Sequence, residues 1–155
     1  MKPCILHSKN DLASANIFSH LIKLNPGIAH LELETLTNPD AQLLESHPSD
    51  YFIAVSRHRS AANTKSFTTH TPGNWGANEF GGEPWKLSFC YPTLLALMLN
   101  ELHARQIPGW EVSLEVDHHG PSLGKPIIFV EIGSTETEWV NEDAGRRVAD
   151  AVQSA

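Results

Sequence analysis

Short runs of strand-forming residues alternate with helical patterns along most of the chain, and this alternation most constrains its fold. Runs rich in β-branched or aromatic residues predict strands at 3–7, 29–33, 51–56, 66–70, 111–118 and 127–132. Apolar residues at helical spacing predict helices at 11–24, 92–106 and 135–153, with a short fourth helix at 40–45. Strands that alternate with helices indicate an α/β fold, a three-layer sandwich around a mixed, mostly parallel sheet.

The chain has 155 residues, of which 41% are hydrophobic and 19% charged, and this is typical of one globular domain. We therefore expect a single α/β domain over 1–155. The longest apolar run, at 94–99, is far too short to cross a bilayer, so we expect a cytoplasmic protein without a membrane partner. Cys4 and Cys90 are too few for a disulfide framework and are predicted to be reduced.

The charge balance limits how the protein could contact nucleic acid. Its 18 acidic side chains outnumber the 11 lysines and arginines, which gives a formal net charge of −7. A protein that binds nucleic acid with its whole surface is usually basic, so such a contact here must be local. Arg57, Arg59 and Lys65 form the one plausible basic patch.

Four of the predicted strands end in polar or ionisable residues. His58 and His70 follow the strands at 51–56 and 66–70, His118 ends the strand at 111–118, and Glu131 lies near the end of the last strand. Ligands of α/β sheets bind outside the carboxyl ends of parallel strands. We therefore expect these four side chains to share one rim of the sheet.

These side chains are candidate zinc ligands, because imidazole and carboxylate are common ligands of catalytic zinc. The spacing matches no standard metal motif. Side chains alternate along a strand, which puts His118 in the same register as Val112, Leu114 and Val116. A histidine in an apolar register needs a partner, and the pattern is equally compatible with a hydrogen-bonded structural histidine.

The segment after residue 70 contains further candidates. Pro72-Gly73-Asn74 is compatible with a simple tight turn or with a close approach of a ligand to the backbone. Trp75, Phe80 and Trp85 could stack on a nucleobase or pack against the domain. Residue chemistry alone thus predicts a hydrolase-like α/β domain with a histidine-rich site.

Four motifs together are more specific. Ser56-Arg57-His58, His70-Thr71-Pro72-Gly73-Asn74, His118-His119-Gly120-Pro121 and Phe129-Val130-Glu131-Ile132-Gly133-Ser134 resemble, in order and spacing, the D-aminoacyl-tRNA deacylase family of archaeal and plant type. The resemblance implies a phosphorylase/hydrolase-like fold. It also implies hydrolysis of the ester between a D-amino acid and the 3′ end of tRNA, with zinc as the cofactor.

The matching motifs supply the candidate site residues. The catalytic candidates are His70, His118, Asn74 and Glu131, and the candidate zinc ligands are His58, His70, His118 and Glu131. The candidate substrate-binding residues are Arg57, Arg59, Thr71, Pro72, Gly73, His119 and Gly120. Rejection of L-amino acids is assigned to the Pro72-Gly73-Asn74 turn, because a rigid backbone can clash with the wrong enantiomer.

The chain departs from the family in one respect. Family members are longer, and their second half contains a His-Tyr-Ala-Pro-Arg motif that this sequence lacks. Two alternatives therefore stay open beside the deacylase: a catalytically incomplete module that binds the tRNA end, and a metal-dependent hydrolase of another small ester or amide. A homodimer or a partner chain could supply the missing half.

Overall fold

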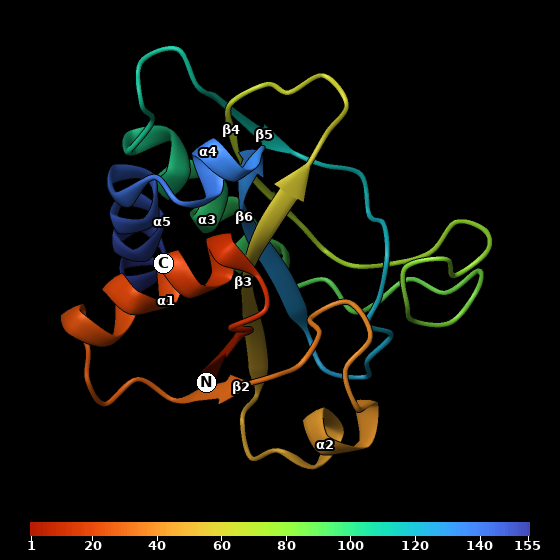
Figure 1. Cartoon of the computed structure of the whole chain (residues 1–155). Coiled ribbons are helices and arrows are strands. Elements are labelled where there is room, and N and C mark those ends of the chain that lie inside the picture. The colour runs from red at the N-terminus through yellow and green to blue at the C-terminus, as the bar shows by residue number, and fades with distance from the viewer.

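The computed structural model describes residues 1–155 and confirms an α/β fold around a mixed, mostly parallel sheet (Figure 1). The strands are β1 (Pro3–His7), β2 (His30–Glu32), β3 (Tyr51–Arg59), β4 (Ser66–His70), β5 (Glu111–Leu114) and β6 (Ile127–Ser134). The helices are α1 (Leu12–Leu24), α2 (Ala41–Ser46), α3 (Pro92–Ala104), α4 (Glu136–Trp139) and α5 (Glu142–Ser154). The six strands lie in the order β2-β1-β3-β6-β4-β5.

One strand pair corrects the expectation of a shared rim. All neighbouring strands are parallel except β4 and β6, which are antiparallel. The carboxyl ends of β4 and β5 therefore point away from those of β3 and β6. The loop at 60–65 between β3 and β4 is too short for the crossover that a parallel connection requires, so the chain turns back on itself.

One face of the sheet is covered by helices. In Figure 1, α1, α3 and α5 lie together on this side, and their apolar faces pack against alternate residues of the strands. Ile53, Val55, Phe67 and Val130 are completely or almost completely buried there. None of the helices combines the length and the apolarity that a membrane span would need.

The opposite face is covered by α2 and by loops, which form the third layer. Near α2 it is apolar, with Leu6, Phe52 and Phe129 fully buried. Further along the same strands the residues on this face become polar, with Ser56 on β3 and Glu131 on β6. This change opens the second face to polar chemistry.

Several predicted elements differ from the structure by one to three residues, among them β3, which continues to Arg59 and so includes His58, and two elements differ more. The strand expected at 111–118 ends at Leu114, and the helix expected at 135–153 is divided into α4 and α5. The division has a local cause, because the Asn141 side chain accepts a hydrogen bond from the backbone N–H of Ala144 at 2.9 Å. Asparagine bound in this way begins a new helix rather than continuing an old one.

Candidate active site

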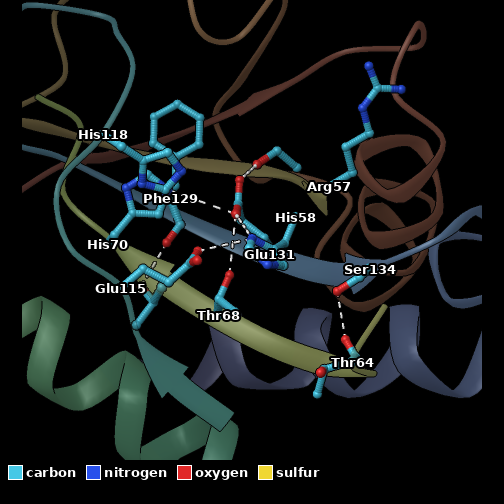
Figure 2. Close-up of polar contacts among 12 residues, drawn as sticks. Arg57, His58, Thr64, Thr68, His70, Glu115, His118, Phe129, Glu131 and Ser134 are labelled. Carbon is cyan, nitrogen blue, oxygen red and sulfur yellow. Dashed lines mark hydrogen bonds and ion pairs between the residues drawn. The ribbon is translucent and has the colours of Figure 1, made fainter. Parts of the chain in front are cut away.

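Glu131 lies at the centre of the polar region of the second face (Figure 2). The Ser56 hydroxyl donates to its Oε1 at 2.6 Å, and the Thr68 hydroxyl donates to its Oε2 at 3.3 Å. His58 Nδ1 and His70 Nε2 lie 3.7 and 3.8 Å from the same Oε2. Burial raises the pKa of this carboxyl, but His58, His70 and Ser56 more than compensate and lower the pKa to about 2. Glu131 is therefore a buried carboxylate.

His58 is held between two carboxylates. Its Nδ1 lies 3.2 Å from an oxygen of Glu115 as well as close to Glu131. The bonds to Glu115 and then Glu131 raise the pKa of His58 to about 9 despite partial burial. At neutral pH the imidazole therefore carries a positive charge. In return, and against the effect of burial, His58 lowers the pKa of Glu115.

Sequence reasoning missed Glu115 as a site residue. It follows the last residue of β5, and its N–H still donates to the Thr69 carbonyl at 3.0 Å, which keeps it aligned with β4. The only sequence signal was that Glu115 lies near the end of the strand expected at 111–118 and faces away from Val116. That signal does not reveal which residue of another strand the carboxylate will contact.

A second group consists of three histidines. The rings of His70 and His118 are stacked with centroids 4.2 Å apart, and His119 lies 4.9 and 4.5 Å from them. In each ring, Nδ1 is bonded to a backbone carbonyl: Thr71 at 3.1 Å for His70, Val116 at 2.9 Å for His118 and Gly120 at 2.6 Å for His119. A carbonyl only accepts, so each Nδ1 carries the proton and each Nε2 presents a free lone pair.

The environment keeps two of these rings neutral. Burial lowers the pKa of His70, and burial followed by the neighbouring His70 lowers the pKa of His119 to about 4. Nε2 of His70 is fully buried without a hydrogen-bond partner. Neutral imidazoles with free Nε2 atoms can accept a proton or bind a metal ion.

The predicted proximity of His58, His70, His118 and Glu131 is confirmed by these distances. They meet on a face of the sheet rather than at a rim, and they fall into two possible metal-binding groups instead of one: His70 with His118 and His119, and His58 with Glu115 and Glu131. The potential ligand atoms of each group lie within 4.8 Å of one another. The expected apolar register of His118 is wrong, because β5 ends at Leu114 and His118 is exposed.

A cavity of about 450 Å³ opens onto these groups. Its lining includes His58, His118, His119 and Glu131, together with Arg57 and Arg59. The Arg57 guanidinium points away from Glu131 in Figure 2 and lies over the Trp139 ring at 5.3 Å. Both arginines are exposed, so they lie at the edge of the cavity.

The remaining predicted residues shape the wall beside the cavity. Thr71 is buried, and Pro72 forms an isolated bridge with His118. At Gly73 a Cβ would come within 2.8 Å of the Leu87 side chain, so the glycine permits a contact within the protein. Asn74 Nδ2 donates to the carbonyls of Gly81 and Glu83, at 2.9 and 3.0 Å.

Gly120 has a similar packing role. A Cβ at this position would come within 2.3 Å of the Gly82 nitrogen and the Thr37 carbonyl oxygen. Only glycine allows these three backbone segments to meet. The N–H of Gly120 also donates to the Phe80 carbonyl at 3.2 Å, which ties the histidine segment to the loop after β4.

Comparison with known proteins gives consistent matches. A family model described as D-aminoacyl-tRNA deacylase matches residues 45–155. A D-aminoacyl-tRNA deacylase of Methanocaldococcus jannaschii is 38% identical over 98% of this chain and 62% of its own length. The first curated relatives are covered over 38% to 62% of their length, so the chain spans less than two thirds of each.

Solved structures agree with the fold. A crystal structure of a conserved protein of unknown function, AF0625, superposes with a TM-score of 0.86 at 32% identity, covering 97% of this chain and 61% of the other. The N-acetylmuramyl-L-alanine amidase Ami1 of Mycobacterium abscessus superposes with a TM-score of 0.59 over 97% of this chain and 94% of its own. At 12% identity, this second likeness concerns the fold alone.

Proposed function

Because the chain belongs to the D-aminoacyl-tRNA deacylase family, we propose that it hydrolyses the ester bond between a D-amino acid and the 3′ end of tRNA. The observation that carries this proposal is the buried Glu131 carboxylate, which lies between a charged and a neutral histidine below an open cavity. The products are a free D-amino acid and tRNA, which amounts to chiral proofreading.

Ester hydrolysis needs a group that takes a proton from water and a group that stabilises the oxyanion. In the metal-free site His70 suits the first task, since its Nε2 is neutral and unpartnered. This role is an alternative to zinc binding at the same nitrogen, because one lone pair cannot hold both a proton and a metal ion. Glu131, 3.8 Å away, stabilises the imidazolium that forms when His70 accepts the proton. His58 suits the second task, because its positive charge faces the same cavity.

The residues present also fit a zinc ion. The unpartnered His70 Nε2 and the fixed Nδ1 protons of His70, His118 and His119 match the three-histidine set of catalytic zinc sites. We assign zinc to these three Nε2 atoms. A bound zinc ion would polarise the ester carbonyl and lower the pKa of water. Compared with the four ligands expected from the sequence, this set keeps His70 and His118 and replaces His58 and Glu131 by His119.

The tRNA is proposed to approach past Arg57 and Arg59. These exposed arginines border the cavity of a protein whose net charge is −7, and phosphates bind arginine strongly. A protein that acts on tRNA works where tRNA is used, which favours the cytoplasm. Because the relatives are longer, a homodimer or a second polypeptide is proposed to complete the site if this chain alone is incomplete.

The test compares one tRNA charged with the D or the L form of the same amino acid. We expect the wild-type chain to release the D-amino acid at least about 100-fold faster than the L form. We also expect chelation to slow the reaction and added Zn²⁺ to restore it. His119→Ala should reduce both zinc content and rate, whereas His103→Ala, which changes an exposed histidine on α3, should affect neither.

The same assay separates the alternatives. Binding of the tRNA without turnover would favour the incomplete module. Turnover that ignores the tRNA would favour a hydrolase of other small esters or amides. Equal rates on the D and L esters would contradict chiral proofreading.

A further inference from the structure

The loop between β4 and α3 presents large aromatic side chains to solvent. Trp75, Phe80, Trp85 and Phe89 are 62%, 70%, 80% and 63% exposed. Single exposed apolar residues are common, but a group of aromatic residues on one loop usually marks a binding surface. In Figure 1 this loop extends on the side of the sheet that helices α1, α3 and α5 leave open.

This loop is held in place by backbone hydrogen bonds. Asn74 N–H donates to the Lys86 carbonyl and Trp85 N–H donates to the Gly76 carbonyl, both at 2.9 Å. At the tip, a Cβ on Gly81 would come within 2.2 Å of the Thr37 oxygen, so the loop packs directly against another backbone segment. The aromatic side chains are therefore exposed on an ordered platform.

Two of these aromatic residues line a second cavity, of about 320 Å³. Its other lining residues include His118, His119, Glu79 and Asp117. Phe80, His118 and His119 also line the first cavity, so the two spaces are adjacent. A ligand that reaches the candidate catalytic groups passes the aromatic platform.

The charges of the two cavities differ. The first is lined by Arg57 and Arg59 together with three carboxylates (Asp11, Glu34 and Glu131), whereas the second has only the carboxylates Glu79 and Asp117 and no lysine or arginine. Carboxylates repel phosphate but accept hydrogen bonds from the exocyclic amines of adenine and cytosine. The second cavity therefore favours an uncharged planar group that carries an amine, held between aromatic faces.

We propose that Trp75 and Phe80 stack on the 3′-terminal adenine of tRNA in the second cavity, and thereby deliver the ester to the first. This proposal rests on the proposed deacylase function, since it identifies the part of that substrate which the loop binds. Unpaired bases stack on aromatic side chains in single-stranded nucleic-acid binding, and each contact changes affinity measurably. Trp85 is on the same loop but lines neither cavity.

The test measures the affinity of uncharged tRNA with and without its terminal adenosine. For the wild-type chain we expect the intact tRNA to bind about 5- to 100-fold more tightly, which is the range for one stacked base. Trp75→Leu and Phe80→Leu should bring the ratio of the two affinities close to one. Trp75→Phe should retain a preference, because a phenyl ring still stacks, and Trp85→Leu should keep the wild-type ratio.

Equal affinity of the wild-type chain for the two tRNAs, or no binding of either, would overturn the proposal. A preference for the intact tRNA that survives in both leucine variants would also overturn it, because the loop would then serve another partner such as a protein segment. Loss of this preference in Trp85→Leu would overturn it too, because Trp85 lines neither cavity. Uncharged tRNA cannot be deacylated, so this result is independent of turnover. Hydrolysis of the D-ester without a terminal-adenosine preference would remove this proposal alone.

Discussion

At the scale of single residues, Glu131 retains its charge in the interior because several neighbours replace the water it has lost. A buried carboxylate without partners would be protonated. Here the Ser56 and Thr68 hydroxyls donate to it, and His58 supplies a positive charge. The result is a fixed negative charge next to the neutral His70, which prepares the site for proton transfer.

His7, which lies outside the site, allows the effect of burial on a histidine pKa to be tested through stability. Its ring stacks on Phe18 at 3.6 Å, and burial followed by His30 lowers its pKa, against a smaller opposite effect of Glu32. Because the folded-state pKa is lower than the unfolded value of 6.5, His7 stabilises the fold above that pH. This contribution is lost as the pH falls below 6.5 toward the folded-state value.

We therefore expect the free energy of unfolding to fall between about pH 7.5 and pH 5.5, and to fall less in His7→Phe, which keeps the stacked ring. Urea denaturation at both pH values measures this difference. His103→Ala, on the exposed surface of α3, should retain the wild-type pH dependence. An identical fall in the wild type and in His7→Phe would mean that His7 does not titrate as described.

At the scale of elements, the boundary between α4 and α5 depends on one side chain. Asn141 Oδ1 accepts from Ala144 N–H at 2.9 Å, at the beginning of a helix that packs against α1 and α3. Asn141→Ala should lower the free energy of unfolding by about 1 kcal/mol. Asn100 is exposed and lies in the middle of α3, away from the helix ends. Asn100→Ala should therefore not lower the free energy of unfolding, because alanine is the better helix former.

Denaturant titration of these two variants checks the prediction. A loss of stability in Asn100→Ala equal to that in Asn141→Ala would show that a general change, and not the cap, is responsible.

The sequence predicted the positions of the strands along the chain better than their order and direction in the sheet. Strands β1 and β4 have the predicted bounds because alternating apolar residues and flanking turns are local signals. The short loop at 60–65 makes β4 run opposite to β3, but the insertion of β6 between these two strands is a pairing of segments far apart in the chain. Local patterns carry little information about such pairing.

The sequence predicted most of the residues of the candidate site but not how they are arranged. His58, His70, His118 and Glu131 do meet, but the reason differs from the expected common strand ends: all four project from or beside one face of the sheet. Glu115 was missed because its role depends on a contact across strands. The tight-turn interpretation of Pro72-Gly73-Asn74 is wrong, because this segment is extended, with Pro72 bridged to His118 and Gly73 bridged to Leu87.

At the scale of the whole molecule, the two faces of the sheet have different tasks. The helices α1, α3 and α5 cover one face with an apolar core, and loops on the other face surround the polar cavity. This asymmetry leaves His58, His118 and His119 at the cavity, and the aromatic loop beside it, accessible from one side. The proposed substrate, the 3′ end of a tRNA, can therefore reach the site without opening the core.

The most direct test of this function is the rate of D-aminoacyl-tRNA hydrolysis by Glu131→Gln relative to the wild type, measured in single-turnover experiments. Gln keeps the shape of the side chain but removes the charge beside His58 and His70, so we expect the rate to fall at least about 100-fold while the circular dichroism spectrum is unchanged. Glu111→Gln, at the exposed start of β5, should react at the wild-type rate. Hydrolysis by Glu131→Gln at the wild-type rate, or a wild-type rate equal to the uncatalysed one, would contradict the proposed function.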